Sequence, residues 1–343
     1  MLRGGIIGLG NVGIAAHVPA WARCRDVAIA GVTDAVAARR AVVEPILPGA
    51  RWYDSAEAMI AGADLDFVDI CTPPSTHGRL IKVALERGLH VLCEKPLVGS
   101  LVELTALTRM ATARHRVLHT VHNWHHAPIV HRTWQLVREG AIGRVSRVVW
   151  KTLRTHPAAT RDDGNGNWRL DPAVAGGGVL TDHGWHVFYI VPSWIGERPM
   201  TVSARLETRR HTRSTVEDTA TVHVTFPHAT ADVLLTWAAE ARDNQAELTG
   251  TAGSIHLEDT VLTLRRGDGE RRWTMEPGLS NGSVHLDWFH PVVDRFVFSV
   301  IEGHLDGSNL REASVCVAIE SSARESSRRG GRAVPLAPAA LAL

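Results

Sequence analysis

The tripeptide Glu94-Lys95-Pro96 follows an apolar run that ends at Cys93, and its lysine is the first residue to which chemistry can be assigned. In an open parallel sheet, ligands bind beyond the carboxyl ends of the strands. A lysine at such an end can hydrogen-bond a substrate hydroxyl and, as a fixed cation, stabilise the alkoxide that forms when hydride leaves. The alternative is a surface lysine beside a turn proline. The position at a strand end favours the functional interpretation.

A second candidate is the glycine run 176–178, which is followed by Asp182 and His186. On a helix the i,i+4 spacing puts these two side chains on one face. Histidine can remove a hydroxyl proton near neutral pH, and a nearby carboxylate would orient the imidazole and raise its pKa. The alternative is that Asp182 complements the helix dipole and that His186 is a half-buried ring with satisfied hydrogen bonds.

Three glycines, Gly8, Gly10 and Gly13, have the spacing of a dinucleotide-binding fingerprint and stand between a predicted strand and a predicted helix. The first glycine permits a tight turn, the second lets the backbone approach a pyrophosphate, and the third lets the helix pack closely on the strand. The sequence therefore predicts that this turn binds a dinucleotide.

Asp34 ends the next predicted strand, near the distance at which an acidic residue meets the adenosine ribose 2′-hydroxyl. Its carboxylate would repel a 2′-phosphate, which predicts NAD rather than NADP, although Arg39 and Arg40 lie close enough to weaken this preference. The alternative is that Asp34 caps a helix over residues 35–43.

The 19 histidines raise the question of a metal site, because several fall in one short span. The chain has no HExxH or CxxC motif, and His119 and His122 would lie out of phase on a strand. We therefore expect no metal and interpret the enrichment as incidental. The histidines concerned are His115, His119, His122, His125, His126, His131, His183 and His186.

The pattern along the chain predicts two α/β domains. Over residues 1–122 strands alternate with helices, which indicates a doubly wound parallel Rossmann sheet. Over residues 123–343 the strands follow one another closely after a Gly/Asp/Asn-rich loop (155–178), which indicates an α+β domain with a large, open, mostly antiparallel sheet. Two helices, over 287–302 and 310–328, are expected to close this domain.

Composition excludes several classes of protein. The 343 residues are 45% hydrophobic and 21% charged, with a net charge of +1, so no field would attract nucleic acid or a membrane surface. No apolar run approaches the roughly 20 residues of a membrane span. The first apolar residues belong to the glycine fingerprint rather than to a secretory signal, and the four cysteines form no CxxC pair, so we expect a cytoplasmic protein.

Taken together, these residues resemble the Gfo/Idh/MocA family, the family of glucose-fructose oxidoreductase and inositol dehydrogenase. The resemblance runs from Gly5 to about Leu336. It is carried by the opening glycine fingerprint, the run Thr72-Pro73-Pro74-Ser75-Thr76-His77, Glu94-Lys95-Pro96, Asn123 followed by Pro128, Trp168-Arg169, and the glycine run with Asp182 and His186. The chain departs after Asn123, where members often place arginines and this sequence has Trp124-His125-His126.

The resemblance implies a role for each matched position. Lys95 and His186 would be the catalytic pair, with Asp182 beside the reacting carbon. The substrate would also meet Asn123, Trp168 and Arg169. The cofactor would be bound by Gly8, Gly10, Asn11, Val12, Gly13, Asp34, Thr72, Pro73, His77, Glu94 and Lys95.

We therefore expect an NAD-dependent dehydrogenase that acts on a secondary alcohol, or the matching ketone, of a sugar, cyclitol or related polyol. Two other classes remain open: an NAD-dependent glycosidase that oxidises its sugar transiently, and a noncatalytic dinucleotide-sensing regulator. We also expect a homodimer or homotetramer formed through the C-terminal sheets, because strands rich in Val, Leu and Trp would need a cover.

Overall fold

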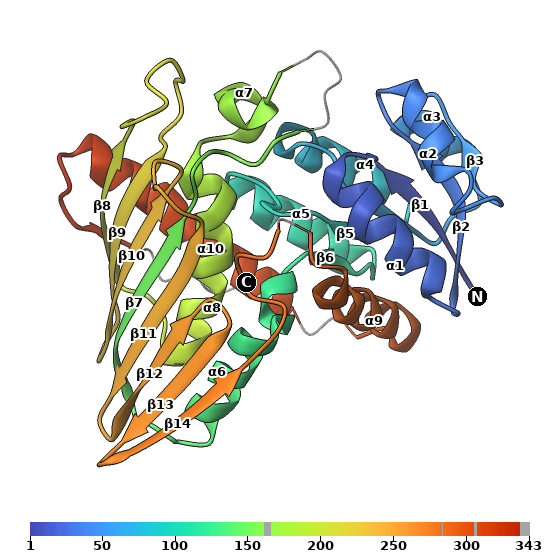
Figure 1. Cartoon of the computed structure of the whole chain (residues 1–343). Coiled ribbons are helices and arrows are strands. Elements are labelled where there is room, and N and C mark those ends of the chain that lie inside the picture. The colour runs from blue at the N-terminus through green and yellow to red at the C-terminus, as the bar shows by residue number, and fades with distance from the viewer. Residues whose placement is uncertain (161–165, 283, 305–306, 337–343) are drawn as a thin grey trace.

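The computed structural model describes all residues except 161–165, 283, 305–306 and 337–343. Figure 1 shows two sheets, one at each side of the molecule, with helices between and around them. Among the described helices, none is both long enough and apolar enough to cross a membrane.

The first sheet is parallel and has the strand order β3-β2-β1-β4-β5-β6. This is the order of a dinucleotide-binding Rossmann sheet, with its switch point between β1 and β4. The expected doubly wound fold is confirmed. The strands are β1 (Leu2–Ile7), β2 (Val27–Thr33), β3 (Arg51–Trp52), β4 (Phe67–Ile70), β5 (His90–Cys93) and β6 (Leu118–Thr120).

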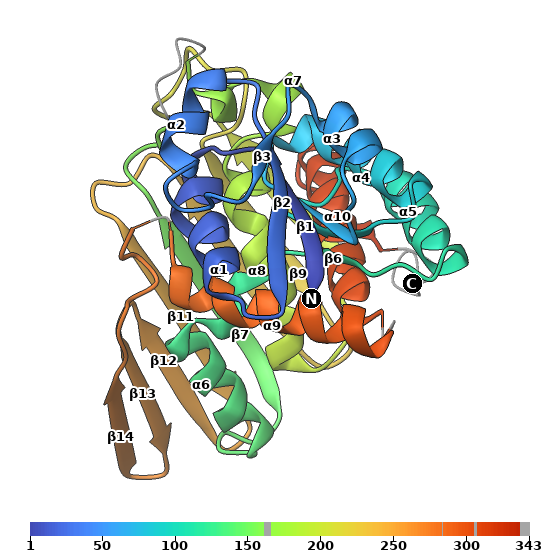
Figure 2. The same ribbon diagram turned by 90° about the vertical axis from the view of Figure 1, so that its right-hand side faces the viewer.

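Helices cover both faces of this sheet because its strands are apolar on both sides. The π-helical turn η1 (Gly13–His17) and α1 (Val18–Arg23) pack on one face, and α3 (Ala56–Gly62), α4 (His77–Glu86) and α5 (Leu101–Ala113) pack on the other. In Figure 2 these two groups lie on opposite sides of β1 and β2. The helix expected over 35–43 is split into a 3₁₀ turn, η2 (Ala37–Arg39), and a short α2 (Arg40–Val43).

The second sheet has the order β14-β13-β12-β11-β7-β10-β9-β8-β15. All neighbours are antiparallel except β7 and β10, so the expectation of a mostly antiparallel sheet is confirmed. The strands are β7 (Val145–Leu153), β8 (Thr201–Glu207), β9 (Thr219–Thr225), β10 (Thr230–Thr236), β11 (Asp243–Gly250), β12 (Gly253–Glu258), β13 (Val261–Arg266), β14 (Gly269–Thr274) and β15 (Val334–Pro335).

The inner face of this sheet is covered by three helices, α6 (Pro128–Arg138), α8 (Trp185–Ile195) and α10 (Ser308–Arg328). One inward row crosses four strands as Ala246, Trp150, Val233 and Val222, all of them buried. Because successive side chains of a strand point to opposite faces of the sheet, the apolar residues of this row all face the core.

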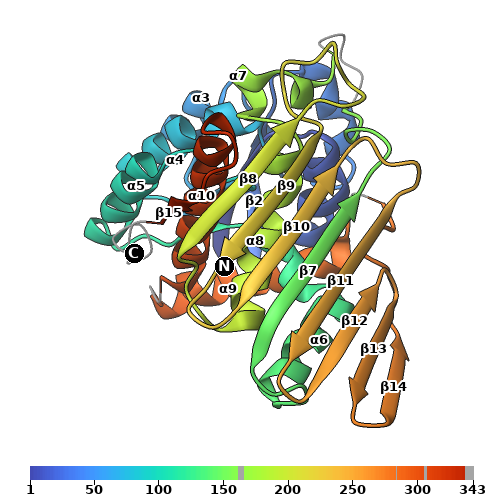
Figure 3. The same cartoon turned by 90° about the vertical axis from the view of Figure 1, so that its left-hand side faces the viewer.

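The outer face of this sheet is polar. An apolar face in need of a cover, which we expected as the reason for an oligomer, is therefore not found there. The matching outward row runs through Glu247, Val149, Asp232, His223 and Ser203. Figure 3 shows this face with no helix over it. The Val, Leu and Trp residues of the strands therefore do not need a second subunit to cover them.

The long helix near the end of the chain, α9 (Leu286–Glu302), returns to the Rossmann domain. Phe289, Val293 and Phe296 of α9 join the apolar cluster that contains Ile6 and Trp21. Residue 122 lies between the last strand of the first sheet and the first strand of the second. The helix α9, from the C-terminal part of the chain, nevertheless packs against β1 and α1 of the Rossmann domain.

Candidate active site

A cavity of about 740 Å³ lies at the carboxyl ends of β1, β2, β4 and β5, where the switch point of the sheet predicts a ligand. It extends to the helix η6 (Leu180–Gly184) of the second domain. Of the predicted site residues, those that line it are Gly8, Gly10, Asn11, Val12, Asp34, Thr72, Pro73, Glu94, Lys95, Trp168, Arg169 and Asp182. Gly13, His77, Asn123 and His186 do not line it.

The glycine turn fits a dinucleotide phosphate. Gly8 has a φ of 98°, and a Cβ there would lie 2.7 Å from the backbone of Cys71. A Cβ on Gly13 would lie 2.6 Å from the Gly8 carbonyl oxygen, so the third glycine allows the close packing of helix on strand. A Cβ on Gly10 would meet nothing within 4 Å, which leaves the backbone open to the cavity.

Asp34 is already bound by protein donors. Its Oδ2 accepts the Leu9 N–H at 2.6 Å, its Oδ1 accepts the Val36 N–H at 2.7 Å, and Arg39 Nη1 lies 3.0 Å from both oxygens. The carboxylate therefore binds the backbone two residues ahead, but it does not cap a helix, because the N-cap of η2 is Val36 and has no side-chain cap. The alternative interpretation is thus wrong, and Asp34 lines the cavity.

His77 is placed behind the cavity wall. Its two ring nitrogens lie 2.8 Å from the carbonyl oxygens of Pro96 and Thr72, and the residue is fully buried. The imidazole thus ties the Thr72 loop to the turn after β5. It supports the predicted cofactor residues instead of facing the cavity.

Lys95 reaches across the cavity to the second domain. Its Nζ donates to the Asp182 carbonyl oxygen at 2.8 Å and to Asp182 Oδ1 at 3.2 Å. Burial raises the pKa of Asp182, but Lys95, His183 and Arg169 outweigh it and hold that pKa well below its usual range. The carboxylate is therefore ionised, and it holds the ammonium group at the point where the two domains meet.

His186 is not oriented by Asp182, so that expectation is wrong. Its Nδ1 lies 3.1 Å from the Tyr189 hydroxyl oxygen, and its ring stacks on Trp124 at a centroid distance of 4.5 Å. The helix begins with the π-helical turn η6, so the segment from Asp182 to His186 does not have the regular α-helical geometry on which the i,i+4 expectation rested.

The pKa of His186 also moves the other way from the sequence-based expectation. Burial, with a smaller contribution from Lys95, holds it well below 6.5. Its imidazole is therefore neutral at physiological pH.

Trp168 and Arg169 form one unit in the wall of the cavity. The Arg169 guanidinium lies over the Trp168 ring, 4.4 Å from its centroid, and Arg169 Nε is 3.6 Å from Asp182 Oδ2. Part of the glycine-rich loop before them, residues 161–165, lies outside the described residues.

Below the cavity lies a buried ionic cluster that sequence reasoning missed. His17 Nδ1 is 2.7 Å from Asp69 Oδ2, and His17 Nε2 is 3.0 Å from Glu94 Oε1. Burial lowers the pKa of His17, but the Asp69 carboxylate outweighs it and raises that pKa well above 6.5. Glu94 Oε2 in turn accepts the Lys95 N–H at 2.9 Å. An imidazolium thus supports the segment that carries Lys95.

The two halves of the chain match two family models. The oxidoreductase family model for the NAD-binding Rossmann fold matches residues 2–122, and the model for the GFO/IDH/MocA C-terminal domain matches residues 130–256. The chain is 30% identical over 262 residues to dTDP-3,4-didehydro-2,6-dideoxy-alpha-D-glucose 3-reductase of Streptomyces antibioticus, covering 75% of each protein. The chain belongs to the GFO/IDH/MocA family.

Other members are similar to it over most of their length. D-apiose dehydrogenase of Paraburkholderia graminis is 27% identical over 275 residues, which are 76% of this chain and 69% of that enzyme. The solved structure of levoglucosan dehydrogenase with NADH and levoglucosan has a TM-score of 0.83 at 22% identity, covering 98% of this chain and 99% of the other, and it shows the shared fold. The resemblance and the predicted NAD(P)-dependent oxidoreductase acting on CH–OH groups are confirmed.

Three histidines of the span 115–131 make ordinary side-chain contacts. His122 and His125 bind Glu312, whereas His131 stacks on Trp134. Within the described residues, the one group with the spacing of metal ligands is His17, Asp69 and Cys71. Both nitrogens of His17 face carboxylates, so this imidazole offers no lone pair to a metal.

Proposed function

We propose that this enzyme transfers hydride between a nicotinamide cofactor and a secondary carbinol, or its ketone, of a sugar, cyclitol or related polyol. The observation that carries the proposal is the Lys95–Asp182 contact, which holds a cation at the junction of the dinucleotide turn and the second domain. Names of relatives, such as D-apiose dehydrogenase, support a sugar or polyol as the substrate.

Lys95 would stabilise the substrate oxygen. Its ammonium uses two contacts with Asp182, so a third N–H can reach a substrate oxygen and stabilise negative charge on it. Because Asp182 stays ionised, the ammonium is held in one position through the reaction. When bound, the nicotinamide C4 supplies or accepts the hydride.

His186 would exchange the proton with the same oxygen. Its pKa lies well below 6.5 because of burial, so the imidazole is neutral and able to accept a hydroxyl proton. The residue is only 6% exposed, which protects that proton from bulk water. Asn123, Trp168 and Arg169 would bind the rest of the substrate.

We propose NAD as the preferred cofactor. Asp34 is held in place by two backbone N–H groups, so its carboxylate cannot turn away from the ribose. A 2′-phosphate would meet this fixed negative charge. The remaining proposed cofactor contacts are Gly8, Gly10, Asn11, Val12, Thr72, Pro73 and Glu94. Gly13 and His77 would support these contacts from behind the cavity wall.

A screen for NAD reduction over sugars, inositols, sugar acids and nucleotide sugars tests the function. With the substrate found, Lys95→Ala should lower kcat by about 10² to 10³ and His186→Ala by about 10² to 10⁴, with NAD binding retained. The double variant should lose less than the product, because both groups act on one transition state. A His186→Ala variant with normal kcat would show that another group moves the proton.

The same screen separates the two alternatives. A glycosidase would hold NAD tightly and would not consume it, and a sensor would bind NAD without turning over any substrate. Lys95 held on an ionised Asp182 supports turnover. We also propose a cytoplasmic location, supported by four free cysteines in the described chain. A homodimer or homotetramer through the outer sheet face is a further proposal, supported by a broad sheet face with no helix over it. Such an interface would be polar, because the outward residues of that face are mostly polar.

A further inference from the structure

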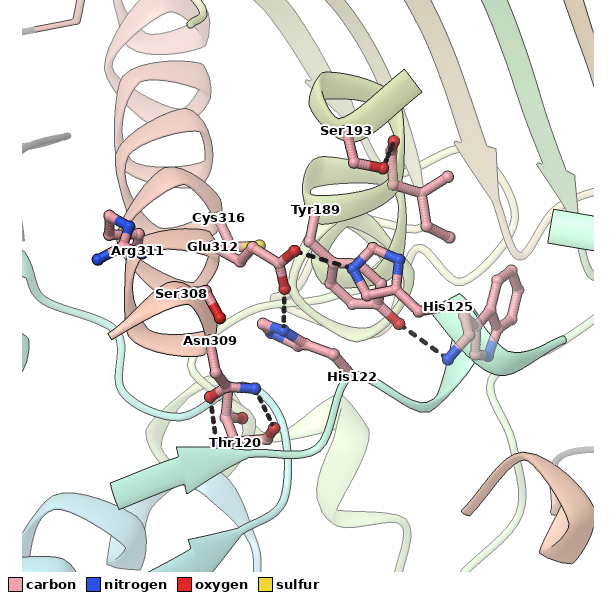
Figure 4. A network of polar contacts seen from close by, with 12 residues as sticks. Thr120, His122, His125, Tyr189, Ser193, Ser308, Asn309, Arg311, Glu312 and Cys316 are labelled. Atoms are coloured by element: carbon pink, nitrogen blue, oxygen red, sulfur yellow. Dashed lines mark hydrogen bonds and ion pairs between the residues drawn. The ribbon is translucent and has the colours of Figure 1, made fainter. Parts of the chain in front are cut away.

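A carboxylate on α10 binds two histidines that flank Asn123, the residue after which the chain departs from its family. Glu312 Oε2 is 2.9 Å from His122 Nδ1, and Glu312 Oε1 is 3.0 Å from His125 Nε2. Figure 4 shows the carboxylate between the two imidazoles. A bidentate carboxylate that joins two rings from one short turn fixes the turn as well as the rings.

The helix that carries Glu312 is itself tied to the strand that precedes the two histidines. Asn309 Oδ1 accepts the Thr120 N–H at 2.8 Å, and Asn309 Nδ2 donates to the Thr120 carbonyl oxygen at 2.9 Å. Glu312 lies three residues further along α10 and His122 two residues further along the chain from β6. The Asn309–Thr120 hydrogen bonds, drawn in Figure 4, therefore hold Glu312 close to His122.

The protonation state of His122 follows from its partners. Trp185 Nε1 donates to His122 Nε2 at 3.1 Å, and an indole nitrogen can only donate. Nε2 must then be the unprotonated nitrogen, and Nδ1 carries the proton that Glu312 accepts. Burial holds the pKa of His122 below 6.5, in agreement with a neutral ring.

Both rings pack against Tyr189. The centroid of the Tyr189 ring lies 4.2 Å from that of His122 and 4.6 Å from that of His125. The phenol is 1% exposed, and burial raises its pKa well above 10, so it keeps its proton. Its oxygen accepts the Trp124 N–H at 3.0 Å and faces His186 Nδ1 at 3.1 Å.

We propose that Tyr189 is a positioning residue for His186 and that Glu312 holds Tyr189 in place. Tyr189 is the only hydrogen-bond partner that the described residues give His186, so its hydroxyl fixes Nδ1 and leaves Nε2 for the substrate oxygen. Stacking on Trp124 fixes the plane of the imidazole. This proposal rests on the role of His186 in the proposed function.

The activity test uses changes that remove one atom or one charge. Tyr189→Phe should lower kcat by about 10 to 10², since a displacement of about 1 Å at a reacting group can cost 10² in rate. Glu312→Gln should lower it less, by about 3- to 10-fold. Substrate KM and NAD affinity should stay within about twofold, because orientation acts on the transition state.

Matched controls are present in the chain. Tyr53 is the other tyrosine, and Tyr53→Phe should leave kcat unchanged. Glu325 lies on the same helix as Glu312 and also contacts two side chains, those of Arg328 and Arg329, so Glu325→Gln removes the same charge away from the site. This variant should behave as the wild type.

The decisive comparison repeats Tyr189→Phe in a His186→Ala background. If Tyr189 acts by orienting His186, its removal should change kcat by less than about twofold there. A tyrosine with only a structural role would keep its full effect without His186, and that result would overturn the proposal.

A spectroscopic readout keeps the test independent of turnover. In protein labelled with ¹⁵N-histidine and saturated with NAD, the His186 ring signals, assigned by their loss in His186→Ala, should shift in Tyr189→Phe and in Glu312→Gln but in neither control. Unchanged His186 signals in Glu312→Gln would overturn the proposal. If instead His186→Ala retains normal kcat while these signals shift, the positioning stands and the proposed proton-transfer role fails.

Discussion

Replacement of His17 by phenylalanine should destabilise the protein strongly, because it removes the cation that neutralises two carboxylates in the Rossmann domain. The imidazolium lies 2.7 Å from Asp69 and 3.0 Å from Glu94, and its side chain is fully buried. Phenylalanine keeps the ring that packs on Phe289 at 4.0 Å, so no cavity contributes to the loss. The change therefore removes the charge and both ring hydrogen bonds while an aromatic ring stays in place.

The size of the effect depends on the hydrogen bonds that the two carboxylates retain after His17 is replaced. Asp69 Oδ2 retains the Trp21 indole N–H at 2.6 Å, and Asp69 Oδ1 already lacks a partner. Breaking a buried ion pair by removing one partner costs about 3–5 kcal/mol. At about 2 °C per kcal/mol for a chain of this length, His17→Phe should lower Tm by roughly 8 °C.

The direction in which this loss of stability changes with pH shows whether the His17 ring is charged. The pKa of His17 is higher in the folded state than in the unfolded state. The stability that His17 contributes is therefore fully present below the unfolded-state pKa of about 6.5, and it is lost as pH rises through the folded-state pKa. The difference in unfolding free energy between wild type and His17→Phe should thus shrink above pH 6.5, by at most about 1.4 kcal/mol per pH unit.

Denaturant unfolding of both proteins between pH 6 and pH 9 measures this difference. His228→Phe is the control: His228 pairs with Glu197 at 2.8 Å, but its side chain is 59% exposed, and such a pair is worth at most about 1 kcal/mol. A difference for His17→Phe that is constant or grows above pH 6.5 would show that the buried imidazole is neutral and refute the reasoning.

Three further outcomes are expected. The wild type should show a higher kcat/KM with NAD than with NADP, and a higher value with NADP would contradict the proposed preference. The ratio of the two kcat/KM values should fall in Asp34→Ala and stay unchanged in Arg40→Ala. Gly178→Ala should lower Tm by several degrees, because its Cβ would lie 1.9 Å from the Glu217 carbonyl oxygen and overpacking costs about 1–3 kcal/mol; an unchanged Tm would contradict this. Light scattering should give a multiple of 37.3 kDa, and a monomer would rule out packing through the outer sheet face.

The sequence by itself determined the Rossmann half and the family of this protein. A glycine fingerprint, an apolar strand and an acidic residue at its end are local signals, since each depends on backbone conformation within a few residues. Lys95 was found in the same way, from its place after a strand. The close succession of the later strands, without helices between them, was also enough to predict the second sheet.

Tertiary structure alone decided how the catalytic candidates are held. Lys95 meets Asp182 across 87 positions, and His122 meets Glu312 across 190, separations at which no periodicity carries information. The i,i+4 spacing of Asp182 and His186 suggested one partner, but in the folded chain His186 meets Tyr189, three residues further along α8.

The charge of His17 and the polarity of the outer sheet face were likewise decided by packing. A histidine titrates according to the groups around it, and Asp69 reaches His17 from β4 while Glu94 reaches it from the turn after β5. The strands contain both apolar and polar residues, and only their alternation against α6, α8 and α10 shows which set faces solvent. Burial and long-range pairing are properties of the folded chain, and so are the pKa values that depend on them.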